Sequence, residues 1–155
     1  MVNTDFETVL ENRRSVRSFT KLIPPERDIR RILQAAEMAP SAGGLNARKI
    51  LVVRGDSKKE ALSEAAFGQD FIKGAPFVLV FCADTKSISP YGDRGVELYC
   101  IQDASIAAEN ALLMITNLGM AACWVGAFDE KKVTESCGLP EYLRPVALVP
   151  LGYEK

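Results

Sequence analysis

Residues 95–118 constrain the fold most, because their apolar and small side chains spread over more than one stripe of a helix. A helix that is apolar over most of its circumference must be covered on most sides. In a chain of 155 residues, either the rest of one monomer or a second subunit could provide that cover. We favour a homodimer that buries this long central helix. The residues concerned are Leu98, Ile101, Ala104, Ala107, Ala108, Ala111, Leu112 and Ile115.

Apolar periodicity and turn residues predict the other elements. The helices expected besides the central one are residues 5–13, 25 to Pro40, 57–66 and 129–137. Their predicted start and stop signals are Thr4, Pro25, Ser57, Asp129 and Gly138. The strands expected are residues 49–54, 77–83, 121–128 and 146–151. The continuous apolar run at 77–83 indicates a strand covered on both faces. The order predicts one α+β (mixed α/β) domain over residues 1–155, with a small central mixed sheet flanked by helices.

Composition excludes several classes of function. The net charge of −1 gives no overall basic field for nucleic acid or an anionic membrane. The first ten residues carry acidic groups and no long apolar run, so we expect no secretory signal and a cytoplasmic location. The chain has no histidine and its four cysteines form no CxxC pattern, so no metal site is expected. Without histidine, Ser-His-Asp and Cys-His catalysis is excluded, which leaves a bound cofactor or other side chains to do difficult chemistry.

The segment Arg13-Arg14-Ser15-Val16-Arg17 is the first candidate site. If the chain is extended there, Arg13, Ser15 and Arg17 fall on one side and offer two guanidinium groups and a hydroxyl to a phosphate. The alternative is a solvated basic end of a helix.

Two further segments could face a flat ligand. The run from Ala39 to Asn46 is a turn of small residues, whose glycines would allow a close approach of the backbone. The run from Cys123 to Phe128 contains the only tryptophan and a glycine whose amide could face a ring. The alternatives are an ordinary connecting loop and a buried strand. There is no GxGxxG motif after the first strand and no GxxxxGK[ST] motif, so dinucleotide-fold and P-loop interpretations lose their main support.

Together these segments resemble the nitroreductase family of FMN enzymes. The similarity rests on RRSVRSF, APSAGGLN, GMAACWVGAFDEKKV and the closing RPVALVPLGY, in this order over nearly the whole chain. The resemblance implies an intertwined homodimer with FMN at the subunit interface. In it, Arg13, Ser15 and Arg17 would hold the phosphate and ribityl chain, with Arg14 alongside.

The resemblance also implies which residues contact the flavin ring. Pro40, Ser41, Ala42, Gly43, Gly44 and Leu45 of the opposite subunit would cover it, with Asn46 where relatives often have glutamine. Gln69 would lie near the pyrimidine end, and Val125, Gly126 and Ala127 near the reactive nitrogen N5. Relatives usually continue past the final strand with a basic residue that helps to bind the phosphate. This sequence ends at Lys155, so we expect weaker retention of FMN.

The implied activity is reduction of a small acceptor with NAD(P)H. NAD(P)H would pass a hydride to FMN and leave, and a nitroaromatic, quinone, enone or free flavin would take its place, giving ping-pong kinetics. No side chain need act as a catalytic acid. Two other possibilities are a flavin-fragmenting or dehalogenating relative, and an FMN-binding carrier or sensor without turnover.

Overall fold

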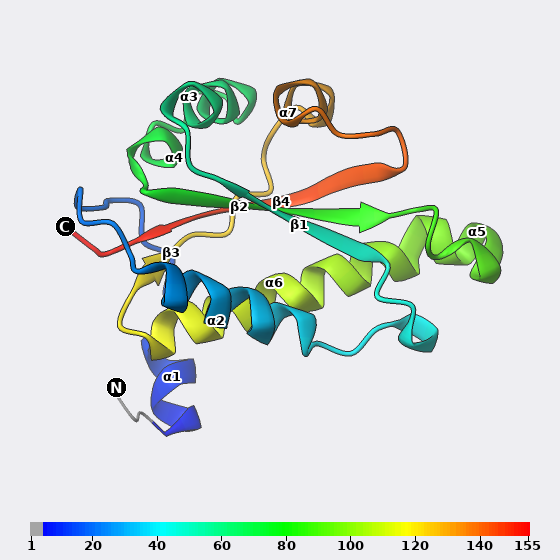
Figure 1. Ribbon diagram of the computed structural model, residues 1–155, viewed down its shortest axis with the longest axis horizontal. Helices are drawn as coiled ribbons and strands as arrows, with labels where there is room; N and C mark the ends of the chain where they lie inside the picture. Colours follow the sequence, from blue (N-terminus) through cyan, green and yellow to red (C-terminus); the bar gives the residue numbers. More distant parts are fainter. Residues whose placement is uncertain (1–4) are drawn as a thin grey trace.

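A four-stranded sheet lies at the centre of the computed structural model, which describes residues 5–155 (Figure 1). Its strand order is β1-β2-β4-β3, and neighbouring strands pair antiparallel. The expected sheet was mixed. Within the described residues, parallel pairing occurs only in the isolated bridge of Ser15 with Ala122. The strands are β1 (Arg48–Val53), β2 (Phe77–Asp84), β3 (Ala121–Ala122) and β4 (Leu143–Gly152).

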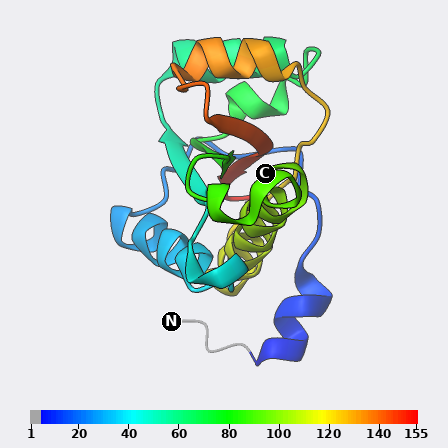
Figure 2. The same ribbon diagram turned by 90° about the vertical axis from the view of Figure 1, so that its right-hand side faces the viewer.

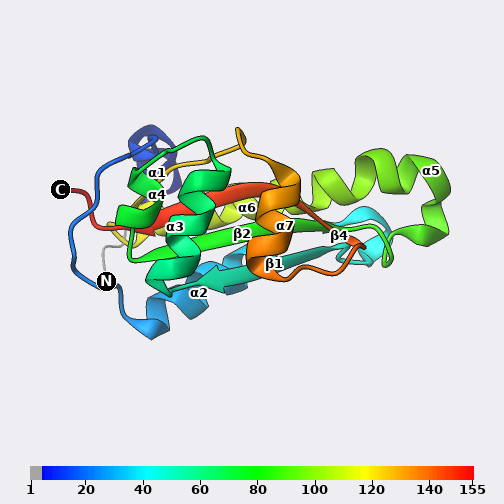
Figure 3. The same cartoon turned by 90° about the horizontal axis from the view of Figure 1, so that it is seen from above.

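Helices cover both faces of the sheet (Figure 2). One layer holds α2 (Glu26–Glu37) and α6 (Cys100–Asn117), and α1 (Phe6–Asn12) contacts α6 from outside. The other layer holds α3 (Asp56–Ala65), α4 (Phe71–Gly74) and α7 (Glu130–Cys137), as the view from above shows (Figure 3). Short turns complete the chain at Ala42–Gly44 and Ser89–Tyr91, followed by α5 (Gly92–Arg94) and a π-helical turn, Gly95–Tyr99, that leads into α6.

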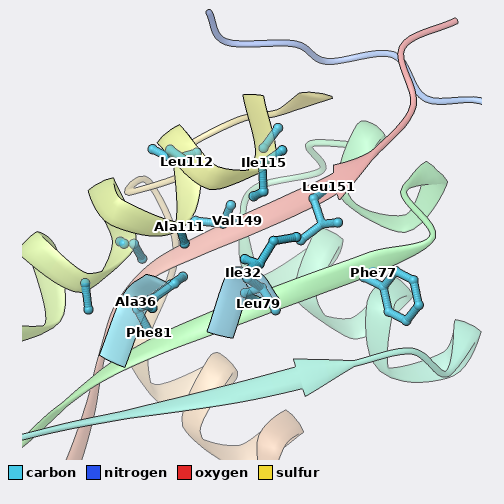
Figure 4. Packing of buried hydrophobic residues seen from close by; sticks show 14 of the residues in the cluster. Ile32, Ala36, Phe77, Leu79, Phe81, Ala111, Leu112, Ile115, Val149 and Leu151 are labelled. Carbon is cyan, nitrogen blue, oxygen red and sulfur yellow. The ribbon is translucent and has the colours of Figure 1, made fainter. Parts of the chain in front are cut away.

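Strand β2 is buried along its whole length, as its continuous apolar run predicts. Successive side chains of a strand point to opposite faces, so the run divides into two sets. Phe77, Leu79 and Phe81 pack with α2 and α6 in the larger core, which Figure 4 shows. The alternate residues, Val78 and Val80 among them, join a second core under α3 and α7. Both faces of β2 are apolar, so each face needs a layer of helices to cover it.

Helix ends follow the predicted signals at α7 and differ at α3. Asp129 caps α7 by accepting a hydrogen bond from the backbone N–H of Lys132 at 3.1 Å, and Gly138 ends it with a φ of 63°. Ser57 was the wrong cap for α3, because the helix begins one residue earlier at Asp56 and Gly55 is its cap. Thr4 lies outside the described residues; Asp5 caps α1 through Thr8.

The strand expected at residues 121–128 is broken, and Pro150 explains the break. Cys123 donates to the carbonyl oxygen of Pro150 at 3.2 Å, but proline has no N–H to return a bond. Val125 and Leu148 then exchange two hydrogen bonds of 2.8 and 2.9 Å as an isolated bridge. The result is a two-residue β3 followed by an irregular edge segment. Among residues 5–155, no helix is both long and apolar enough to cross a membrane.

The packing between α2 and the sheet predicts a large cost for truncating Ile32, which is 0% exposed. Ile32→Ala should lower the free energy of unfolding by about 2–5 kcal/mol, since it removes buried methyl groups and leaves a cavity. Urea denaturation followed by circular dichroism measures this. Leu22→Ala is the control, because Leu22 is 63% exposed and its loss should change stability by about 0.5 kcal/mol or less. Equal effects of the two changes would contradict the assigned core.

Candidate active site at two separated edges of the chain

The buried side chain of Asp103 binds the backbone of the loop formed by residues 40–46. This loop joins α2 to β1, and the Asp103 side chain comes from α6 and is 2% exposed. Its carboxylate accepts the backbone N–H of Ala42 at 3.0 Å and that of Ala47 at 3.1 Å. Hydrogen bonds from two backbone amides satisfy a carboxylate that is removed from water. The loop is thereby fixed at both of its ends to the central helix.

Arg48 ties the same loop to its surroundings. Its guanidinium group is buried and donates to the backbone carbonyl oxygens of Glu37, Ala39, Pro40 and Asp103 at 2.8–3.3 Å. It also donates to the side-chain oxygen of Asn46 at 3.2 Å. These bonds occupy both terminal nitrogens, so Arg48 is not available to bind a ligand.

The predicted contact residues of the loop divide into an inward and an outward set. The Ser41 hydroxyl accepts the backbone N–H of Asn46 at 3.0 Å, and the exposed Asn46 side chain accepts from Arg48 of β1. Gly43, Gly44 and Leu45 are exposed. Beside them a groove of about 610 Å³ runs between the loop and α6. Its lining includes Pro40, Ala42, Gly43, Tyr91, Ile101 and Ile106.

Gly43 is needed at its position for two reasons. Its φ of 59° lies in the left-handed region that favours glycine. A Cβ there would also come too close to the hydroxyl group of Tyr91, so the Tyr91 side chain would have to move. The positive φ therefore favours glycine here, and the absence of a Cβ lets the Tyr91 ring lie against the loop.

The arginine segment lies at the β3 edge of the sheet. Val16 is buried and donates its N–H to the carbonyl oxygen of Ala122 at 2.9 Å. Ser15 and Arg17, its neighbours, both lie close enough to the Cys123 thiol to lower its pKa, although burial is the larger effect and the pKa is raised overall. Their side chains thus share one side of the segment, as the alternation predicts. Arg14 points elsewhere and forms a bidentate ion pair with Glu154.

The segment after Cys123 continues along this edge. Val125 is buried, whereas Gly126 and Ala127 are exposed. The Gln69 side-chain amide donates to the carbonyl oxygen of Ala127 at 3.1 Å and to that of Ala66 at 3.0 Å. The indole of Trp124 lies beside Gly126, 3.4 Å from where a Cβ would stand. Gln69 and residues 125–127 are therefore brought together, although they are far apart in the sequence.

No protein side chain here is poised for nucleophilic or metal chemistry. Burial raises the pKa of the Cys123 thiol, and it raises that of Cys82 to about 12. Both thiols are therefore protonated at neutral pH. Within residues 5–155 there is no cluster of three or more His, Cys, Asp or Glu side chains that could hold a metal ion.

One chain does not bring all of the predicted residues together. Residues 13–17, 69 and 125–127 belong to the β3 edge and its neighbourhood, where the N-terminal segment and the C-terminus meet (Figures 1 and 3). The loop of residues 40–46 lies beside the start of α6, away from the N-terminal segment and the C-terminus, and Ile101 of α6 lines both its groove and a second pocket that reaches Gly126. Within one chain the arginine segment and this loop therefore lie apart.

The sequence matches the Nitroreductase family over residues 10–69 and 59–153. The chain belongs to the nitroreductase family. An NADH dehydrogenase of Thermus thermophilus is 35% identical over 177 residues, covering 96% of this chain and 86% of that protein. A solved nitroreductase family protein from Clostridium novyi superimposes with a TM-score of 0.90 at 29% identity, covering 98% and 86% of the two chains. An NADPH:FMN oxidoreductase from Vibrio harveyi, solved with NAD+, gives 0.90 at 26% identity, covering 98% and 70%.

Sequence reasoning missed Asp103, the residue on which the loop depends. One signal was available in the sequence. Asp103 stands next to Ala104 and four residues before Ala107, so it lies on the apolar face of the predicted central helix. A carboxylate on a buried helix face must find hydrogen-bond donors there. Its partners, the backbone N–H groups of Ala42 and Ala47, lie 61 and 56 residues away and could not be identified from this local pattern.

The two hydrogen bonds of the Asp103 carboxylate predict how the loop responds to Asp103→Asn. An amide has one oxygen acceptor where the carboxylate has two, so one of the two loop N–H groups should lose its partner. Hydrogen exchange of the Ala42 and Ala47 amides should speed up by about tenfold or more. Asp84→Asn is the control, because Asp84 binds the backbone of Lys86 and Ser87 instead. Unchanged exchange in residues 40–47 of the Asp103 variant would show that the loop does not need this carboxylate.

Proposed function

We propose that this protein is an FMN-dependent oxidoreductase that reduces a small acceptor, such as a nitroaromatic, quinone, enone or flavin, with NAD(P)H in a ping-pong sequence. The observation that carries this is the β3 edge, where Ser15 and Arg17 lie beside Cys123, which shortly precedes the exposed backbone of Gly126 and Ala127. Family membership and the flavin reductases among the structural neighbours support it.

The charged end of this edge fits a phosphate. Arg13 and Arg17 form no salt bridge within residues 5–155, so their charge is not neutralised by a neighbouring carboxylate there. Arginine donates in a planar geometry that matches phosphate oxygens. The Ser15 hydroxyl, on the same side as Arg17, adds a neutral donor. We assign this set to the phosphate and ribityl chain, with Arg14 contributing less because it is paired with Glu154.

The neutral end fits a flat ring. Gly126 and Ala127 use neither of their backbone N–H groups in hydrogen bonds among the described residues, and both are exposed. Gln69 braces the backbone at Ala127, so these donors are held in place before a ligand arrives. Fixed N–H donors at such a place stabilise negative charge that develops on a bound ring. We assign Val125, Gly126, Ala127 and Gln69 to the ring of the flavin.

Bound FMN would supply the two-electron chemistry that this histidine-free chain lacks. The chain's own part is to bind and orient. Because both edge residues are exposed, donor and acceptor can use the same place in turn, which is what a ping-pong sequence requires.

The separation of the loop of residues 40–46 from the arginine segment supports a homodimer. Pro40, Ser41, Ala42, Gly43, Gly44, Leu45 and Asn46 would cover the flavin bound by the other subunit. Apolar surface is available for this contact around α6: Ile106 is 38% exposed, Phe6 65% and Met38 82%. A groove of about 330 Å³ between α1, α2 and α6 adds Leu113 and Met114 to the same surface. Exposed apolar surface of this kind marks interaction sites.

The phosphate assignment predicts a selective defect in Arg17→Ala. Affinity for FMN should fall about ten- to hundredfold, the loss of about 1.5–3 kcal/mol for a charge-assisted hydrogen bond, while affinity for riboflavin stays the same. Quenching of Trp124, the only tryptophan, reports binding of either ligand. Arg27→Ala on α2 is the control for removing an exposed arginine. Equal losses for FMN and riboflavin would refute a phosphate contact, and no quenching in the native protein would refute flavin binding altogether.

The dimer proposal predicts a mass near twice 16.9 kDa in sedimentation. Ile106→Glu places a charge in the proposed interface, so it should produce monomers and weaken FMN binding at least tenfold, because residues 40–46 of the partner are lost. Lys131→Glu on α7, across the sheet from α6, should change neither. A monomer that still binds FMN tightly would show that one chain makes the whole site.

A further inference from the structure

Phe67 has a positive φ, a backbone conformation that residues 5–155 otherwise show almost only at glycine. Its φ is 58°, and Asn46 is the only other non-glycine residue among residues 5–155 with a positive φ. Asparagine tolerates this region, whereas a bulky aromatic residue in it is an outlier. Such strain persists where the surrounding structure or a function requires it.

The surrounding motif shows what the position normally demands. Phe67 donates to the carbonyl oxygen of Glu64 and Gly68 to that of Ser63, which is the Schellman end of α3. The ends of α6 and α7 repeat this bonding pattern, and there the left-handed residues are Gly119 and Gly138. Phenylalanine thus replaces glycine at one of three equivalent helix ends.

Packing within the chain does not compensate for the strain. Phe67 is 74% exposed, the largest exposed fraction of any aromatic residue in the described chain. An apolar ring in water contributes almost nothing to folding. Both the backbone conformation and the exposure of the ring are therefore unfavourable in the isolated chain.

The location indicates what covers the ring. Phe67 stands two residues before Gln69, whose amide bonds the carbonyl oxygens of Ala66 and Ala127. The Schellman end of α3 is thereby attached to the exposed edge at Gly126 and Ala127. The indole of Trp124, which is also partly exposed, lies beside Gly126. Trp124 consequently lies beside the place assigned above to the flavin ring, and the turn that carries the exposed Phe67 is attached to that place through Gln69.

We propose that Phe67 is a specificity-determining residue whose ring packs against a planar aromatic electron acceptor at this edge. The inference rests on the proposed function and narrows its acceptors to flat aromatic molecules, since ring–ring contacts favour these over compact acceptors. The strained left-handed backbone keeps the ring out of the protein core and available to the acceptor.

Phe67→Gly tests this with two opposite readouts. The melting temperature of the FMN-free protein should rise by about 2–4 °C, because glycine relieves the strain. The ratio of kcat/KM for 4-nitrobenzoate to kcat/KM for ferricyanide should fall about three- to tenfold, because only the first acceptor offers a ring. The Kd for benzoate, an aromatic ligand that is not reduced, should rise by a similar factor in the FMN-loaded protein.

Two further variants separate the ring from the backbone. Phe67→Leu keeps the strain and loses the aromatic ring, so the melting temperature should stay near that of the native protein while the acceptor ratio falls. Gly138→Phe is the matched control: it places the same ring at the same motif of α7, where space is open. It should lower the melting temperature and leave the acceptor ratio unchanged.

An unchanged acceptor ratio and benzoate Kd in Phe67→Gly would overturn the proposal. A drop in sedimentation mass or in melting temperature would also overturn it, by showing that the ring is a contact between subunits or within the fold. Failure of the proposed function is distinguishable, because the native protein would then not quench Trp124 with FMN.

Discussion

Two buried charged groups, Asp103 and Arg48, fix the relative positions of α2, the glycine-rich loop, β1 and α6. The Asp103 carboxylate accepts hydrogen bonds from two backbone amides, and the Arg48 guanidinium donates to carbonyl oxygens at the end of α2 and the start of the loop, and to that of Asp103. Breaking one partner of such a network leaves a buried charge without compensation, which costs several kcal/mol. The loop is therefore a rigid feature of the surface, although it has no regular structure beyond one short turn. A rigid loop can cover a ligand on another subunit without first losing much conformational freedom.

Much of the fold could be predicted from the sequence because a few residues leave the chain little choice. The apolar run of β2 demands cover on two faces, and Asp129 with Gly138 fixes both ends of α7. The break in the edge strand could not be predicted from residues 121–128 alone. It depends on Pro150, which lies in another strand and pairs with Cys123 only after the sheet has formed. Local patterns give elements, whereas pairing partners are a tertiary property.

The candidate site shows the same difference between local patterns, which could be predicted, and tertiary contacts, which could not. The period-two spacing of Ser15 and Arg17 was enough to place both on one side of the chain, because alternation is a local property. Arg14 was expected beside them, yet its ion pair depends on Glu154, 140 residues away. Ser41 and Asn46 were expected to offer hydrogen bonds to a ligand, and in the isolated chain Ser41 accepts the backbone N–H of Asn46 while the Asn46 side chain accepts from Arg48. Polar residues in a tight turn satisfy nearby backbone groups first, so their presence alone does not indicate a ligand.

The arginine segment is held by its backbone, and this has a consequence for binding. Val16 bonds to Ala122 on one side, while farther along Thr20 bonds to Tyr153 and Lys155 bonds to Ser18. The segment is thus fixed between the edge strand and the end of the chain without help from the side chains of Arg13, Ser15 or Arg17. Those side chains keep their hydrogen-bonding capacity for something outside the fold. Binding a phosphate there need not order the backbone, so the favourable charge-assisted contacts are offset mainly by the ordering of two arginine side chains.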